Sequence, residues 1–284
     1  MDNEIEKFIE ELKNRDIAKE DIEKLTEYAN QGYIPWINSN KLIEILKKYA
    51  EAGNVNAQYL IAIYFSEKED YQKYLYWLRQ SAENGCTKAW YLLAMDSNNN
   101  KEAFKWCLKS AIIGNIHAQN LLGNFYYGGT GCKKDIKKAL KWYKISAKHN
   151  EDLAQESLGY MYEKGKRVKQ NYKKAIYWYR KSTKQNNEYA QYNLGYLYEK
   201  GRGVKQNYKK ALEWYKQSAI NDFPDAQYRL GYFYEKGKGT KKNLEKALEW
   251  YKQSADEGSK KGQNAFQRLS KNIIPKKGTL QLKK

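Results

Sequence analysis

Few residues of this 284-residue chain have the types and spacing that catalysis or metal binding needs. His117 and His149 are the only histidines, and neither has a second histidine or cysteine at the spacing of a metal site. Each is expected in or near the turn that opens a helix, as a solvated residue rather than a base or ligand. The sequence therefore predicts no metal site and no cofactor.

The cysteines and the paired glycines also give no catalytic pattern. Cys86, Cys107 and Cys132 are odd in number and irregular in spacing, and none has a basic partner that would activate a thiol. The Gly-x-Gly pairs at 129–131, 201–203 and 237–239 lack the third glycine of a dinucleotide loop and the Gly-Lys-Ser/Thr ending of a phosphate loop. They are predicted to be turn glycines.

Paired carboxylates for acid–base chemistry cannot be assigned from the sequence. Glu163 and Glu199 hold equivalent places 36 residues apart, and both are expected to end a helix at a solvated edge. Residue types alone place no two carboxylates in one cleft. The chain is therefore predicted not to be an enzyme and to have no small-molecule substrate. The remaining candidate residues are binding residues, and a repeat positions them.

A period of 36 residues governs the second half of the chain. The block Ala-Gln-x-x-Leu-Gly-x-x-Tyr begins at Ala118, Ala154, Ala190 and Ala226. Leu158 and Tyr162 share one face of a first helix, helix A, and Gly165 permits the positive φ that ends it. Asn171 is expected to cap a second helix, helix B. Each repeat is thus predicted to be a helical hairpin, which must stack on its neighbours to bury its apolar face.

The predicted fold is all-α, a right-handed α-solenoid of stacked helical hairpins that forms one continuous array. Residues 118–261 are the regular repeats, and residues 57–117 are a degenerate stretch in which the period shortens to 32 and 29. Residues 1–56 are expected to form atypical acidic capping helices, and residues 262–270 a C-terminal capping helix. The basic residues 271–284, with Pro275 and Gly278, are expected to form a flexible tail.

The repeat resembles that of the Sel-1-like repeat family, a relative of the tetratricopeptide repeat. The resemblance covers about residues 57–262 and is close over 190–219, through Leu194, Gly195, Tyr198, Gly201, Gly203, Val204, Lys210, Ala211, Trp214, Tyr215 and Ala219. It implies scaffold or adaptor work in assembling complexes, signalling and bacterial host interaction. The family's cysteine-rich bacterial subgroup is not matched, because Ala154, Ala190 and Ala226 stand at the first helix-A position.

Charge is distributed unevenly along the chain. The net charge of +19 divides into −4 for residues 1–56, +1 for 57–117 and +22 for 118–284. A basic block favours acidic or polyanionic partners, although AT-rich codons would also raise Lys, Asn, Tyr and Ile together. The sequence shows neither a signal peptide nor a transmembrane stretch, so a cytoplasmic protein without a membrane partner is expected, with signal-independent export as an alternative.

Helix A carries the first candidate binding surface. Tyrosines recur at two places four residues apart, which share one side of the helix. The predicted partner-binding residues, called here the helix-A face, are Tyr160, Tyr192, Asn193, Tyr196, Tyr228, Arg229 and Tyr232. In related helical repeats the A helices line the concave side, so a partner segment is expected there. The alternative is that the rings pack along neighbouring helices and stabilise the stack.

The loops between helices A and B carry the second candidate surface. This basic edge comprises Lys133, Lys134, Lys166, Arg167, Lys169, Arg202, Lys205, Lys238, Lys241 and Lys242. Equivalent loops project from one edge of a solenoid, where an acidic protein would fit. Nucleic acid is the alternative, with the chain as an inhibitor or accessory factor of a nucleic-acid machine, but no recognition motif is present. We therefore predict a non-enzymatic protein-binding scaffold.

Overall fold

The computed structural model of the chain describes residues 2–15, 17–32, 34, 38–276 and 279–282. The chain divides into two compact units, residues 1–134 and 135–284. Each unit is a stack of helices with its own buried core, and each is described by itself.

Unit 1 contains α1 to α8. Their bounds are Asp2–Asn14, Lys19–Asn30, Asn40–Glu51, Val55–Glu67, Tyr71–Glu83, Thr87–Asp96, Asn100–Ile112 and Ile116–Gly128. α1 packs on α3, while α2 and α3 pack on α4. Leu12, Leu25, Leu46 and Leu60, one from each of these four helices, are fully buried in a single core cluster. α1, α2 and α3 thus occupy the segment predicted to hold the capping helices, of which residues 1, 16, 33 and 35–37 lie outside the described residues.

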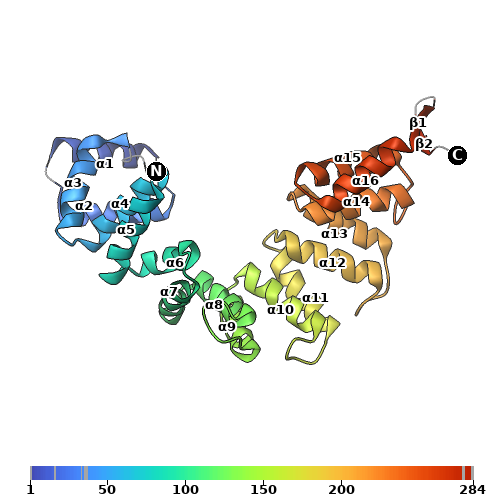
Figure 1. Cartoon of the computed structure of the whole chain (residues 1–284), viewed down its shortest axis with the longest axis horizontal. Helices are drawn as coiled ribbons and strands as arrows, with labels where there is room; N and C mark the ends of the chain where they lie inside the picture. Colours follow the sequence, from blue (N-terminus) through green and yellow to red (C-terminus); the bar gives the residue numbers. More distant parts are fainter. Residues whose placement is uncertain (1, 16, 33, 35–37, 277–278, 283–284) are drawn as a thin grey trace. The chain divides into compact units, whose positions relative to one another are not determined.

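Unit 2 contains α9 to α16. Their bounds are Ile136–Lys148, Asp152–Lys164, Tyr172–Thr183, Glu188–Lys200, Tyr208–Ile220, Pro224–Lys236, Leu244–Asp256 and Lys260–Lys271. α10 pairs with α11, α12 with α13 and α14 with α15; each pair packs on the next, and α16 packs on α14 and α15 (Figure 1). The predicted stack of helical hairpins is therefore confirmed within the unit, and α16 lies in the segment predicted to hold a capping helix.

Two short strands follow α16, in the segment predicted to be a flexible tail. β1, Ile273–Lys276, pairs antiparallel with β2, Thr279–Leu282, and Ile273 lies opposite Leu282. Isoleucine and leucine on both sides of the glycine favour paired strands, although the charge, the proline and the glycine of the tail point to a flexible segment. Positions 277–278 and 283–284 of the tail lie outside the described residues.

The hairpins of unit 2 begin and end as predicted. Helix B is capped by Asn171, Asn207 and Asn243. The side-chain oxygen of each asparagine accepts a hydrogen bond from the backbone N–H three residues later, at 2.9, 2.9 and 2.8 Å. Helix A ends at left-handed glycines, namely Gly165, Gly201 and Gly237, with φ of 67°, 66° and 67°. Both predictions are confirmed because each depends on geometry within a few residues.

A recurring serine near the end of helix B fastens each hairpin of unit 2. The serines are Ser182, Ser218 and Ser254, all fully buried. Each hydroxyl donates to a backbone carbonyl in the first turn of helix A of its own hairpin, at 2.9, 2.8 and 2.8 Å. A buried polar group left without its bond costs about 1–3 kcal/mol. These serines are therefore part of the scaffold rather than of a binding surface.

Candidate functional site

The helix-A face lies on α10, α12 and α14, and all seven of its residues are half-buried. The Tyr192 ring lies 5.5 Å from the Tyr215 ring of helix B and 5.2 Å from the Phe223 ring. The Tyr228 ring lies 5.7 Å from the Tyr251 ring of the next helix B. At these two positions the alternative interpretation applies, because the rings pack against the interior of the stack.

The other three tyrosines of the helix-A face carry cations on their rings. Lys164 Nζ lies 5.5 Å from the ring centre of Tyr160. Arg202 Cζ lies 5.3 Å from the ring centre of Tyr196. Lys238 Nζ lies 5.1 Å from the ring centre of Tyr232. Since Arg202 and Lys238 were predicted on the basic edge, the two candidate surfaces adjoin each other through these cation–π contacts.

The remaining cations of the basic edge are exposed. In unit 2 these are Lys166, Arg167, Lys169, Lys205, Lys241 and Lys242, while Arg202 and Lys238 are half-buried. Lys133 and Lys134 are also exposed and belong to unit 1. Exposed lysines change net charge and association rate more than they change stability. The predicted basic edge thus consists mostly of exposed cations.

A set of buried glutamates at the end of helix A was not predicted. Glu163, Glu199 and Glu235 are only 2%, 3% and 3% exposed, so the expected solvated edge for the first two is wrong. The physical reason is a tyrosine of helix B in the same hairpin, whose hydroxyl donates to the carboxylate at 2.9, 2.8 and 2.8 Å respectively. A signal existed in the sequence, because each glutamate is followed sixteen residues later by a tyrosine.

Arginines of the following repeat and of α16 complete two of these glutamate contacts. Arg229 on α14 forms an ion pair with Glu199 on α12, and Arg268 Nη2 on α16 lies 2.6 Å from Glu235 on α14. Burial raises the pKa of Glu199, but the hydrogen bond from Tyr215 and the charge of Arg229 together outweigh burial and lower it. Arg229, predicted to meet a partner, therefore already holds an anion of its own chain.

The first of the three positions has a different composition. Glu156 of α10 stands at the repeat position of Tyr192, and its Oε1 accepts a hydrogen bond of 2.9 Å from Asn193 Nδ2 of α12. Burial, and then the negative charge of Glu163, raise the pKa of Glu156 to about 7, while the bond from Asn193 opposes them. The carboxylates of Glu156 and Glu163 thus interact in this repeat, whereas in the next repeat the carboxylate of Glu199 pairs with the guanidinium of Arg229.

The raised pKa of Glu156 predicts a pH-dependent stability. The folded chain holds the Glu156 proton more tightly than the unfolded chain, whose carboxyl titrates near 4.5, so stability falls as the pH rises from 4.5 through about 7. Glu156→Gln should remove this loss and be more stable than wild type by about 1–3 kcal/mol at pH 8, and equal to it at pH 4.5. Urea unfolding at both pH values measures the difference. Glu213→Gln, at an exposed position of α13, is the control, and equal gains for both variants at pH 8 would contradict the assignment.

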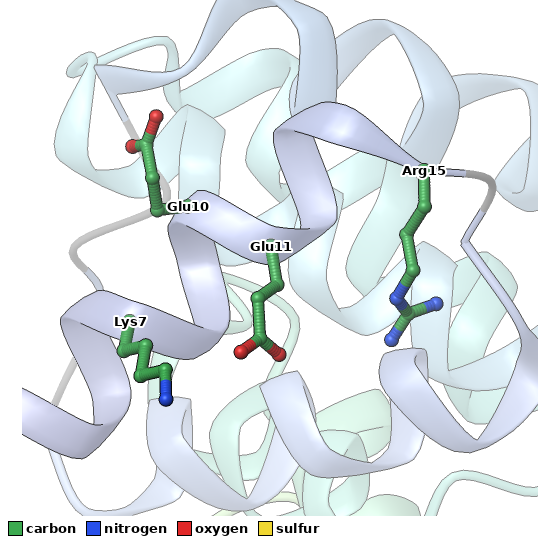
Figure 2. A pocket seen from close by; sticks show the side chains of 4 residues that line it. All are labelled: Lys7, Glu10, Glu11 and Arg15. Atoms are coloured by element: carbon green, nitrogen blue, oxygen red, sulfur yellow. The ribbon is translucent and has the colours of Figure 1, made fainter.

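A depression at α1 is lined by Lys7, Glu10, Glu11 and Arg15 (Figure 2). All four side chains are exposed, and Arg15 also pairs with Asp21 at 2.7 Å. A small-molecule site is mostly apolar and encloses its ligand, which exposed charges of both signs do not do. We assign this depression no catalytic role.

The cysteines show no sign of a catalytic or metal-binding role among the described residues. Cys107 is fully buried, its Sγ lies 3.3 Å from the Ala118 carbonyl oxygen, and burial raises the pKa of its thiol to about 12. All three cysteines are among the described residues, and none forms a disulfide.

Across the described part of the chain, no three His, Cys, Asp or Glu side chains are placed to hold a metal ion. None of the described helices is long and apolar enough to span a membrane.

Comparisons with known proteins agree with the repeat. The sequence model of the Sel1 repeat matches residues 55–86, 89–115, 116–151, 152–187, 188–223 and 224–259. A protective antigen of uropathogenic Escherichia coli strains, described as displaying an SLR fold, is 32% identical over 80% of this chain with a TM-score of 0.69. This chain spans about half of that antigen, 51% of its length. A Sel1 repeat protein from Oxalobacter formigenes is 28% identical over 74% of this chain and 96% of its own, with a TM-score of 0.66. The curated proteins contain no match.

Proposed function

Because the chain belongs to the Sel1 repeat family, we propose that it is a non-enzymatic scaffold that captures a protein partner on the concave helix-A face of unit 2. Sel1 repeat proteins generally mediate protein–protein interaction. The observation that carries the proposal is the row of half-buried rings of Tyr160, Tyr196 and Tyr232, one from each successive helix A. Half-buried aromatic rings are typical anchors of protein interfaces.

The surroundings of these rings support a partner with acidic groups. Arg202 lies between two rings, with its Cζ 5.3 Å from the centre of Tyr196 and 6.0 Å from that of Tyr172 on the preceding helix B. Lys238 repeats this arrangement with Tyr232 and Tyr208, each at 5.1 Å. Rings held in this way lose little freedom on binding, and the adjacent cations favour a carboxylate of the partner.

Partner capture is expected to depend on Tyr160, Tyr196 and Tyr232 together. Changing all three to alanine should weaken binding about 100-fold, because each ring is an anchor whose loss costs about 1 kcal/mol or more. Affinity purification followed by mass spectrometry compares the partners that wild type and variant recover. Tyr177→Ala is the control, since that ring is 53% exposed on helix B. A triple variant that is folded by circular dichroism and recovers every partner would rule out this face.

The nucleic-acid alternative gains no support from the fold or from the relatives. The same purification distinguishes the two partners, because co-purifying nucleic acid gives a high ratio of absorbance at 260 and 280 nm and is released steeply by salt. A protein partner should instead remain with the chain after nuclease treatment. Loss of all binding after that treatment would favour a polyanion on the basic edge over a protein on the helix-A face.

A further inference from the structure

Unit 2 contains three polar sites of one type, each built on a buried glutamate of helix A. We name them site 1, site 2 and site 3, after Glu163, Glu199 and Glu235. In all three, the tyrosine of helix B donates a hydrogen bond to the glutamate carboxylate. The lysine that directly follows the glutamate in the sequence forms an ion pair with the same carboxylate. The bonds from the tyrosine and the lysine are therefore the same in the three sites, which differ in the other polar groups around the glutamate.

Sites 2 and 3 each hold a guanidinium supplied by the chain itself. Arg229 reaches Glu199 from the next helix A, and Arg268 reaches Glu235 from α16. Arg229 and Arg268 stand at different repeat positions, yet both bring an Nη2 atom to the same carboxylate position, Oε2. The glutamate Oε2 therefore binds a guanidinium in both site 2 and site 3, although the two arginines come from different positions of the repeat.

Site 1 lacks this guanidinium and has a second carboxylate. The residue one repeat before Arg229 is Asn193, and its amide bonds Glu156 at 2.9 Å. Both positions carry smaller side chains than in site 2, with Asn193 in place of Arg229 and Glu156 in place of Tyr192. Above pH 7, where Glu156 is ionised, the charged groups of site 1 are Glu156, Glu163 and Lys164, so the site bears one net negative charge, where site 2 bears one net positive charge.

We propose that site 1 binds an arginine side chain of a partner protein, whose guanidinium takes the role that Arg229 and Arg268 have in sites 2 and 3. This inference rests on the proposed function, because the site lies among the residues of the helix-A face. Glu156 and Asn193 are half-buried and so partly accessible to a partner, whereas Glu163 is buried and interacts electrostatically with Glu156. The guanidinium would pair with Glu156, and Glu163 would supply the second negative charge.

Arginine suits this site better than lysine. A guanidinium presents a planar fork of donors that matches a carboxylate, and its flat face can stack on an aromatic ring. Tyr160 and Tyr196 lie on the same face of α10 and α12, as part of the row of half-buried rings. A lysine ammonium is a compact, strongly hydrated charge and would gain less from either feature. The partner segment is thus expected to carry an arginine near the acidic residues that meet the basic edge.

The test uses N-acetylarginine amide as the probe, with N-acetyllysine amide and N-acetylcitrulline amide for comparison. Its binding to the full chain at pH 8 is followed by NMR through the side-chain amide signal of Asn193. We expect a Kd of about 10 mM for the arginine probe and at least tenfold weaker binding of the other two. Glu156→Gln should weaken the arginine probe about tenfold. Equal binding of the arginine and citrulline probes, or no binding at 100 mM, would overturn the proposal.

Asn193→Arg gives a second, independent measurement. This variant places in site 1 the residue that site 2 has at the same repeat position, so its own guanidinium should occupy the carboxylates. We expect it to abolish binding of the probe and to raise the Tm, whereas Asn221→Arg, at an exposed position after α13, should do neither. A variant that binds the probe as wild type does would contradict the proposal.

The arginine-site proposal and the scaffold proposal can fail independently of each other. Site 1 is refuted alone if the probe fails to bind while capture of the partner still depends on the three tyrosines. The scaffold proposal is refuted alone if the probe binds as expected while the triple tyrosine variant recovers every partner.

Discussion

Glu199→Ala should destabilise unit 2 by about 3 kcal/mol, the largest loss we expect from removing a single polar side chain. The carboxylate accepts from the hydroxyl of Tyr215, which is fully buried, and pairs with Arg229, whose side chain is only 20% exposed. Removing it leaves a buried hydroxyl and a half-buried cation without their acceptor. Urea unfolding at pH 7, followed by far-UV circular dichroism, measures the change.

A double-mutant cycle with Arg229→Ala distinguishes loss of the pair from a simple loss of packing. Because the two side chains bond each other, the double variant should lose less stability than the sum of the single variants, by about 1–3 kcal/mol. Glu213→Ala, at an exposed position of α13, is the control and should change stability by less than about 0.5 kcal/mol. Additive effects of the two changes would show that the pair stabilises nothing.

Glu163→Ala offers a comparison within the same molecule. Glu163 has the same tyrosine bond as Glu199 but has Glu156 nearby instead of an arginine. Its removal also relieves the repulsion between two carboxylates, so it should cost less than Glu199→Ala. The rank order of these two variants therefore tests whether the guanidinium makes the difference between sites 1 and 2.

The sequence predicted the features of unit 2 that depend on neighbouring residues. Gly165 ends a helix because its own φ is 67°, and Asn171 caps the next helix through an amide three residues away. Both features depend only on residues within a few positions of each other, so the sequence of one repeat is enough to predict them. The hairpin stack then follows from the period, because a single hairpin cannot bury its apolar face.

The burial of the glutamates could not be predicted in the same way. The partners of Glu199 are Tyr215, which lies on the other helix of the hairpin, and Arg229, which lies in the next repeat. A glutamate two residues before the glycine that ends a helix can be exposed or buried, and only the packing of three helices decides which. The same holds for Tyr192, whose ring packs on Tyr215 although its spacing equals that of a surface residue.

The second glycine of the loop between helices A and B predicts the other large effect. Gly239→Ala should destabilise unit 2 by about 3 kcal/mol, the sum of left-handed strain and overpacking. Gly239 has φ of 68°, and an added Cβ would lie 2.5 Å from the carbonyl carbon and oxygen of Tyr208, the first residue of the preceding helix B. Backbone atoms cannot move aside as a side chain can, so the two repeats would separate. Thermal unfolding measures the loss, and a variant as stable as wild type would contradict this contact.

Arg167 occupies the same loop position two repeats earlier and should respond in the opposite direction. Its φ is 58°, a conformation that costs a residue with a side chain about 1 kcal/mol, so Arg167→Gly should stabilise unit 2 by about 0.5–1 kcal/mol. The same change removes one exposed cation of the basic edge. A strained backbone at an exposed residue such as Arg167 is a reason to test that residue for a functional role. Arg167→Gly should therefore yield a more stable chain that captures an acidic partner less well, and unchanged capture would show that this charge does not serve binding.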